Sequence, residues 1–236
     1  MRYYLVIPAA GSGRRLASTI PKQYAELGSS TVIEHALAPF EADPDCAGIV
    51  IAIASNDPTW PAIAARRPRA IEVAAGGAER AHSVQSALRS LATRARTDEW
   101  VMVHDAARPC FARPDLERLK LELAGDEVGG LLAMPLADTL KRGAAGVDRP
   151  LVEATIERAG LWRASTPQVF RLGLLRDALD AALAAGKLPT DEAQAMEWAG
   201  HAPRLIAGRA DNIKVTTADD LALARAIIAS RTGEKV

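Results

Sequence analysis

The sequence has few of the residues that form disulfides and metal sites. It contains two cysteines, Cys46 and Cys110, and four histidines in 236 residues. The cysteines stand far apart and belong to no Cys-x-x-Cys or Cys/His spacing, so we expect neither a disulfide nor a zinc site, and we expect a cytosolic protein. No Ser/His/Asp arrangement is evident either, which argues against acyl-transfer chemistry.

The chain also lacks net charge and long apolar runs. Its 29 Lys and Arg balance 29 Asp and Glu, so no overall field would attract nucleic acid or an anionic membrane. Pro8 breaks the N-terminal apolar run, which lacks a signal peptide's hydrophobic core, and no segment reaches membrane-spanning length. Any anion binding must therefore come from local clusters of cations.

The chain does contain an alternation of strand-like and helix-like segments. Short β-branched runs alternate with amphipathic ones in the first half, which predicts the α/β class: a mostly parallel, Rossmann-like sheet between helices, with ligands at the carboxyl ends of its strands. Strands are expected at 3–7, 48–54, 71–73 and 100–104. Helices are expected at 31–40, 79–91, 172–185, 191–199 and 218–230, the last starting at a capping box of Thr217 and Asp220.

Residues 136–160 interrupt this pattern. Two strand-like runs, 138–142 and 151–156, flank a turn-rich segment at 143–150, which predicts a hairpin-like arm. Two strands are too few to bury a core, so the arm must pack on the rest of the chain or on a second subunit. We see no repeat or linker and expect residues 1–236 to form a single domain with this arm.

The first loop is the most informative segment. The strand-like run ends at Pro8 and leads into Ala9-Ala10-Gly11-Ser12-Gly13-Arg14-Arg15, with Pro21-Lys22-Gln23 soon after. Small residues allow a close backbone approach to a ligand, and free N–H groups there make an anion cradle. Leu16 stands where a dinucleotide fingerprint or a P-loop has a glycine. The segment therefore matches neither motif but could still bind a nucleoside triphosphate. The structural alternative is a strand-to-helix turn with solvated arginines.

Three later segments carry candidate residues. Asp105 follows an apolar strand and is either a Mg²⁺ ligand or a helix cap, while Arg108 is a phosphate ligand or a rim charge. The glycine pair 76–77 permits close approach to a base and Ser83 offers a hydroxyl, although a plain loop and first helical turn would look the same. Lys214 lies in a strand-like run and is either solvated or directed into the cleft.

Together these segments resemble one family, the 2-C-methyl-D-erythritol 4-phosphate cytidylyltransferases of the non-mevalonate isoprenoid pathway. The resemblance follows the order of the chain and spans nearly all of it. The matching segments are PAAGSGRR (8–15), PKQY (21–24), GGAERAHSV (76–84), VHDAARP (103–109), DTLKR (138–142), ERAGLW (157–162), TPQVF (166–170), TDEA (190–193) and GRADNIKVT (208–216). The family fold has an arm that clasps a second subunit, so the resemblance implies a homodimer through the arm.

The resemblance also implies an activity and a set of residues. The family transfers CMP from CTP to a sugar-alcohol phosphate and releases pyrophosphate, with Mg²⁺ or another divalent cation. The implied catalytic residues, which stabilise the transition state or position the substrate phosphate, are Arg15, Lys22, Arg158 and Lys214. The implied CTP-binding residues are Ala9, Ala10, Gly11, Ser12, Gly13, Gly77, Ser83, Asp105 and Ala106, with Asp105 also the metal ligand. The implied substrate-binding residues are Arg108, Thr139, Arg158, Thr166, Thr190 and Lys214.

Charge alone explains why such an enzyme needs cations. A phosphate monoester is largely dianionic near neutrality and already nucleophilic, so no general base is required. The difficulty is to bring one anion against another, which positioned cations and a divalent metal relieve. The chain departs from the family at Ala78, where an acidic residue is common, and this leaves cytosine recognition there to backbone groups.

Two other functions remain open on the sequence. A cytidylyltransferase for another polyol phosphate, such as ribitol 5-phosphate, would share the CTP half. It would differ around Thr139, Arg158, Thr166 and Thr190. A non-catalytic nucleotide-binding subunit, the other alternative, would be expected to have lost one of four charged residues that this chain retains: Arg15, Lys22, Asp105 and Lys214.

Overall fold

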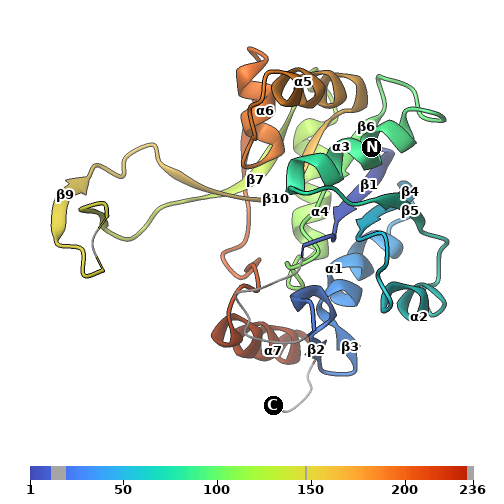
Figure 1. Cartoon of the computed structure of the whole chain (residues 1–236), viewed down its shortest axis with the longest axis horizontal. Helices are drawn as coiled ribbons and strands as arrows, with labels where there is room; N and C mark the ends of the chain where they lie inside the picture. The colour runs from blue at the N-terminus through green and yellow to red at the C-terminus, as the bar shows by residue number, and fades with distance from the viewer. Residues whose placement is uncertain (12–19, 147, 233–236) are drawn as a thin grey trace.

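A seven-stranded sheet forms the centre of the chain, with helices on both of its faces (Figure 1). The computed structural model describes residues 1–11, 20–146 and 148–232. The sheet strands are β1 (Tyr3–Pro8), β4 (Cys46–Ile53), β5 (Glu72–Ala75), β6 (Trp100–Val103), β7 (Gly129–Pro135), β10 (Trp162–Arg171) and β11 (Arg204–Ala207).

Six of the seven described sheet strands run in one direction. Their order is β11-β7-β10-β6-β1-β4-β5, with β1 parallel to both β4 and β6 and with β7 parallel to β11. Strand β10 lies antiparallel between β6 and β7. The carboxyl ends of β1 and β6 therefore lie side by side at one edge of the sheet, where loops can build a common site.

Alternating side chains of the strands divide the core into two layers. Leu5 and Ile7 of β1 pack in one layer with α1 (Val32–Glu41), α2 (Trp60–Ala64) and α4 (Arg113–Leu123). Val6, between them, packs in the other with α3 (Arg80–Leu91), α5 (Leu172–Ala184) and α6 (Glu192–Trp198). This is the period-two alternation of a strand that is covered on both faces.

A third, smaller cluster holds the C-terminal helix against the first loops. Helix α7 (Ala218–Thr232) contributes Ala224, which packs with Leu27 of β2 (Glu26–Leu27) and with Val215. Strand β3 (Ser30–Thr31) pairs with β2 just before α1. The expected capping box at the start of α7 is present: Thr217 N donates to Asp220 at 2.8 Å, and Asp220 N donates to Thr217 Oγ1 at 3.2 Å.

The arm projects far from the sheet, between β7 and β10 (Figure 1). It carries the antiparallel pair β8 (Leu140–Gly143) and β9 (Val152–Ile156), in which Lys141 pairs with Thr155. This confirms the hairpin that the sequence predicts in 136–160. Two apolar side chains near its tip are largely exposed in the single chain: Leu151 at 80% and Val152 at 65%.

The predicted α/β fold class is confirmed, and the expected strands and helices differ from the observed ones by a few residues at their ends. One expected strand does not form, because residues 212–216 have no regular secondary structure. The sequence reasoning also missed α2, α4, β7, β10 and β11. In the described part of the chain, no helix has the length and apolar character needed to cross a membrane.

Candidate active site

A pocket of about 650 Å³ opens where the carboxyl ends of β1 and β6 meet. Its walls are Pro8, the last residue of β1, and the segments that follow three strands: 9–11 after β1, 77–80 after β5 and 105–107 after β6. Lys22, Gln23, Ser83 and Lys214 also line it. This volume is typical of a site for a small molecule.

The first loop is held by a buried amide. Gln23 Nε2 donates to the carbonyl oxygens of Ala9 at 2.8 Å and of Gly11 at 3.3 Å. Because C=O and N–H point in opposite directions across a trans peptide, fixing the Ala9 carbonyl also fixes the direction of the Ala10 N–H. The predicted site residues Ser12, Gly13 and Arg15 lie outside the described residues.

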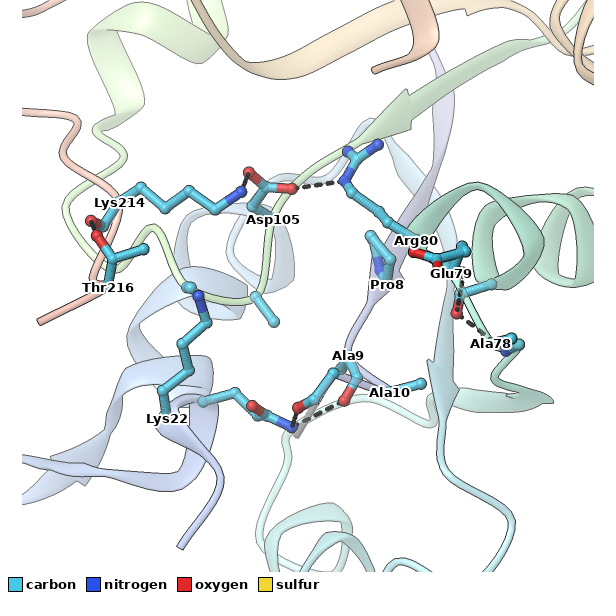
Figure 2. Close-up of a pocket in the computed structure, with 16 residues that line it drawn as sticks. Pro8, Ala9, Ala10, Lys22, Ala78, Glu79, Arg80, Asp105, Lys214 and Thr216 are labelled. Carbon is cyan, nitrogen blue, oxygen red and sulfur yellow. Dashed lines mark hydrogen bonds and ion pairs between the residues drawn. The ribbon is translucent and has the colours of Figure 1, made fainter. Parts of the chain in front are cut away.

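Two lysines from distant parts of the chain approach the same pocket. Lys22 begins the short 3-10 turn η2 (Lys22–Tyr24), and Lys214 lies in the irregular segment that precedes α7. Figure 2 shows both side chains directed toward Asp105, Lys22 from below and Lys214 from one side. The pocket therefore collects cations that are 192 positions apart in sequence (214 minus 22).

Asp105 is the centre of a dense cluster of charges. Its carboxylate accepts from Arg80 Nε at 3.0 Å, from Lys214 Nζ at 2.9 Å and from Arg108 Nε at 3.4 Å. Burial by itself would raise the pKa of Asp105, but the charges of Arg80, Lys214 and Arg108 outweigh it and hold that pKa well below its usual range. Asp105 is therefore a carboxylate at any physiological pH.

A chain of hydrogen bonds supports the backbone beneath Asp105. Thr166 Oγ1 accepts from Asp105 N at 3.1 Å and lies 3.0 Å from His104 Nδ1. His104 Nε2 lies 3.2 Å from the carbonyl oxygen of Arg108, which can only accept, so Nε2 carries the proton and Nδ1 accepts from the Thr166 hydroxyl. Burial lowers the pKa of His104 to about 4, which keeps the ring neutral.

The loop after β5 packs tightly against the first loop. A Cβ on Gly76 would lie 2.2 Å from Ala10 Cβ, and one on Gly77 would lie 2.3 Å from His82 Cβ. Ser83 Oγ accepts from Gly77 N at 3.0 Å and donates to the Glu79 carbonyl at 3.3 Å. Packing against the first loop thus requires a glycine at 76, and the contact with His82 of α3 requires one at 77. The Ser83 hydroxyl fixes the loop that lines the pocket.

The structure brings together about half of the predicted site residues. Those that line the pocket are Ala9, Ala10, Gly11, Lys22, Gly77, Ser83, Asp105, Ala106 and Lys214. Arg108 and Thr166 lie directly behind Asp105 and support it.

Three further predicted contacts lie elsewhere. Thr139 and Arg158 are exposed on the arm, and Thr190 is exposed just before α6. None of the three is among the described residues that line the pocket, so their roles stay predictions.

Sequence reasoning missed three residues of the site: Gln23, Arg80 and Glu192. Gln23 and Arg80 both stand in segments that the family resemblance covers, PKQY and GGAERAHSV, but the sequence alone indicates no role for either. Glu192 stands at the start of the helix expected at 191–199, where helix capping alone explains a Thr-Asp-Glu sequence. Asp191 does cap α6, accepting from Gln194 N at 2.9 Å, whereas Glu192 turns inward to Arg80.

A divalent ion would find limited protein coordination here. Within the described ranges, no group of three or more His, Cys, Asp or Glu side chains could hold a metal. Mg²⁺ commonly binds through one or two carboxylates, with phosphate oxygens and water as the other ligands. Among the described residues that line the pocket, Asp105 and Glu79 carry carboxylates, and the buried Asp105 fits that mode, provided that the ligand brings phosphates.

A mostly parallel sheet with cations around a pocket at its carboxyl edge defines the class: an α/β enzyme that acts on phosphorylated ligands. Residues 3–230 match the family model of 2-C-methyl-D-erythritol 4-phosphate cytidylyltransferase. The chain belongs to this family, a family of nucleotidyltransferases, which confirms the resemblance found in the sequence.

Individual relatives agree. Proteins with that name from Pseudomonas paraeruginosa and Pseudomonas aeruginosa are 54% and 53% identical, each over 93% of both chains. A solved structure of 4-diphosphocytidyl-2C-methyl-D-erythritol synthase superposes with a TM-score of 0.83 at 38% identity, over 96% of this chain and 98% of the other. The Francisella tularensis 2-C-methyl-D-erythritol 4-phosphate cytidylyltransferase gives 0.79 at 35%, over 96% and 100%.

Proposed function

We propose that this chain transfers CMP from CTP to 2-C-methyl-D-erythritol 4-phosphate and releases pyrophosphate. The observation that carries the proposal is the convergence of Lys22, Lys214 and Asp105 on one pocket. Family membership supports the choice of substrates, since the relatives carry that activity in their names. Residues 1–236 would act as one nucleotidyltransferase domain in the cytoplasm.

The reaction is an in-line displacement at phosphorus. An oxygen of the acceptor phosphate forms a bond to the α-phosphorus of CTP, and the bond from that phosphorus to the α,β-bridging oxygen breaks. The electron pair of the broken bond leaves with pyrophosphate, and no proton needs to be removed because the monoester is mostly dianionic at neutral pH. What the protein must supply is positive charge where two anions meet.

The two described lysines have different places in this scheme. Lys22 borders the first loop, and with Arg15 it would stabilise the charge that develops around the α-phosphorus. Lys214 would hold the phosphate of the acceptor in line, and Asp105 would hold a Mg²⁺ that binds with CTP. The ion would supply further positive charge to the phosphate oxygens.

The nucleotide would lie along the loops that follow β1 and β5. The backbone of residues 9–13 would cradle the triphosphate, with Ala106 bordering the nucleotide, and Gly77 and Ser83 would border the cytosine. Since the Ser83 hydroxyl already bonds Gly77 and Glu79, its contribution to the base is largely through the shape of the loop. Ala78 offers only backbone groups to the cytosine.

The arm implies a second subunit. Thr139 and Arg158 are exposed on it, while Leu151 and Val152 leave apolar surface uncovered. We propose a homodimer in which the arm of one copy reaches the pocket of the other, so that Arg158 positions the acceptor phosphate there, beside Thr190 of the receiving chain. A two-stranded hairpin gains its stability by packing on another surface, which supports this arrangement.

Pyrophosphate release tests the reaction directly. The purified protein is assayed with each of the four nucleoside triphosphates in the presence of 2-C-methyl-D-erythritol 4-phosphate, of ribitol 5-phosphate, or of no acceptor. Release only with CTP and the methylerythritol phosphate is expected. Equal or faster release with ribitol 5-phosphate would favour the other polyol-phosphate function, and no release with any pair would favour a non-catalytic subunit.

Mixing two inactive variants tests the exchange of arms. Arg158→Ala and Lys214→Ala should each be nearly inactive alone. In a mixed dimer, one pocket has its own Lys214 and receives the intact Arg158 of the other chain, so random mixing should restore roughly a quarter of wild-type activity. No recovery in a mixture shown to contain mixed dimers would contradict the arrangement.

A further inference from the structure

Arg80 connects the pocket to a buried acidic side chain behind it. Its Nε donates to Asp105 Oδ1 at 3.0 Å, while Nη1 and Nη2 donate to the two carboxylate oxygens of Glu192 at 2.6 and 3.0 Å. The side chain of Glu192 is only 3% exposed. A carboxylate buried to this degree needs a cation with good geometry, and a bidentate guanidinium supplies it.

The position of Glu192 is itself well defined. It is the first residue of α6, whose start is tied to β10 by Gln168: Gln168 Oε1 accepts from Ala193 N at 2.8 Å, and Gln168 Nε2 donates to Asp191 Oδ2 at 2.9 Å. Strand β10 pairs with β6, and Asp105 follows the end of β6. Glu192 is therefore fixed relative to the sheet that carries Asp105.

The two sides of the Arg80 guanidinium thus bind different carboxylates. The Nη edge is fixed by Glu192, and the Nε–H is then presented to Asp105 Oδ1. Because a carboxylate is planar, a partner that fixes one oxygen also fixes the direction of the other. The other oxygen, Oδ2, is the one that holds Lys214 Nζ at 2.9 Å (Figure 2).

We propose that Arg80, anchored by Glu192, is a positioning residue for the transfer reaction. It orients the Asp105 carboxylate so that Oδ2, and with it the Lys214 ammonium, faces the phosphates in the pocket. The inference rests on the proposed function and names a residue pair that this function alone does not assign. Arg80 Nε, Nη1 and Nη2 each donate a hydrogen bond to a carboxylate oxygen of Asp105 or Glu192. We therefore infer that Arg80 acts on the phosphates through Asp105 and not by direct contact.

Two substitutions of opposite charge separate positioning from a simple effect of charge. Arg80→Gln removes a positive charge beside the pocket, and Glu192→Gln removes a negative one. A charge effect would weaken CTP binding in the first and strengthen it in the second, with turnover following in opposite directions. Positioning requires kcat to fall in both, by about 10- to 100-fold, as for other small displacements of reacting groups.

The measurements are kcat and KM for both substrates at saturating Mg²⁺, with the affinity for CTP alone measured by calorimetry. Arg80→Lys keeps the charge but loses the bidentate geometry and should stay at least about 10-fold below wild type. The matched controls are Arg89→Gln on α3, where Arg89 is 62% exposed and pairs with Asp180, and Glu197→Gln on α6, where Glu197 is exposed. Both controls should keep kcat within about twofold.

A double-variant cycle tests whether Arg80 acts through Asp105. In an Asp105→Asn background, Arg80→Gln should lower kcat by less than about threefold further. The carboxylate that Arg80 orients is then a neutral amide, which no longer forms an ion pair with Lys214. Full additivity would overturn the inference. Urea unfolding confirms that each variant is folded in the assay, and where Arg80→Gln does not fold, Glu192→Gln and Arg80→Lys provide the same test.

Failure of the inference and failure of the proposed function give different results. If the wild-type protein transfers CMP but Glu192→Gln keeps or raises kcat, the positioning role is wrong and the function stands. If the wild-type protein releases no pyrophosphate from CTP and the methylerythritol phosphate, the proposed function is wrong, and the positioning role falls with it.

Discussion

The Thr166 hydroxyl offers a sharp test of how the site is built. It accepts from the backbone N–H of Asp105 and donates to His104 Nδ1, and the residue is buried. Thr166→Val keeps the shape of the side chain and removes both hydrogen bonds. The Asp105 N–H and the His104 nitrogen then lose the hydrogen bonds that the hydroxyl makes with them.

The expected loss follows from these two groups. Each buried polar group left unsatisfied costs about 1–3 kcal/mol, so the free energy of unfolding should fall by about 2–4 kcal/mol, allowing for the hydroxyl no longer being buried. For a chain of this size a loss of about 3 kcal/mol lowers Tm by roughly 6–12 °C. Thr166→Ser restores the hydroxyl and should recover most of this loss, because only a methyl group is missing.

The assay is urea unfolding followed by circular dichroism, with Thr155→Val as the matched control. Thr155 lies on the arm, where its hydroxyl accepts from Lys141 Nζ at 2.7 Å on an exposed surface, and its loss should change stability by less than about 0.5 kcal/mol. A Thr166→Val protein within about 0.5 kcal/mol of wild type would refute the hydrogen-bond chain. A raised KM for the acceptor without loss of stability would instead support the direct substrate contact that the family resemblance implies.

Three further expectations concern other parts of the site. Lys22→Ala should lower turnover by roughly 10²–10³-fold in the pyrophosphate assay while leaving the urea midpoint within error, and turnover near wild type would remove Lys22 from the mechanism. Between pH 7 and 5 the metal-free wild type should lose about 2 kcal/mol more unfolding free energy than His104→Gln. The folded pKa of His104 is lowered by burial from 6.5 to about 4, so the unfolded chain takes up a proton in this range and the folded chain does not; equal losses in urea titrations at both pH values would contradict this. Gly76→Ala should yield little soluble protein or a strongly lowered Tm, since its Cβ would lie 2.7 Å from the Ile53 carbonyl oxygen, and a normal melting curve would show that the loop can move.

Local patterns in the sequence were sufficient for much of the fold. The alternation of apolar runs predicts β1, β4, β5 and β6. Strands β1, β4 and β6 are apolar because they lie inside the sheet and are covered on both faces, whereas β5 lies at its edge. The sequence pattern does not predict β10, because its sequence, WRASTPQVFR, mixes a proline and polar residues with apolar ones. Those polar side chains have partners in the structure, as Gln168 and Thr166 show, and such partners are invisible before the chain is folded.

The site was predictable where a residue stands in a recognisable segment and not where its role depends on a distant partner. Lys22 and Lys214 belong to segments shared with the family, and both line the pocket. Arg80 and Glu192 are 112 positions apart, and only the packing of α6 near α3 makes them a pair. The same limit applies to Arg158, whose proposed target belongs to another copy of the chain.

The contact between Gly76 and Ala10 also restricts how this protein can diverge. Shortening Ala10 to glycine would not make room for a side chain at 76, because the Ile53 carbonyl still blocks the other side. Gly76 therefore cannot be replaced by a residue with a side chain unless β4, the strand that carries Ile53, shifts as well. We expect descendants of this chain to vary freely on the exposed surface of α7 long before they lose this glycine.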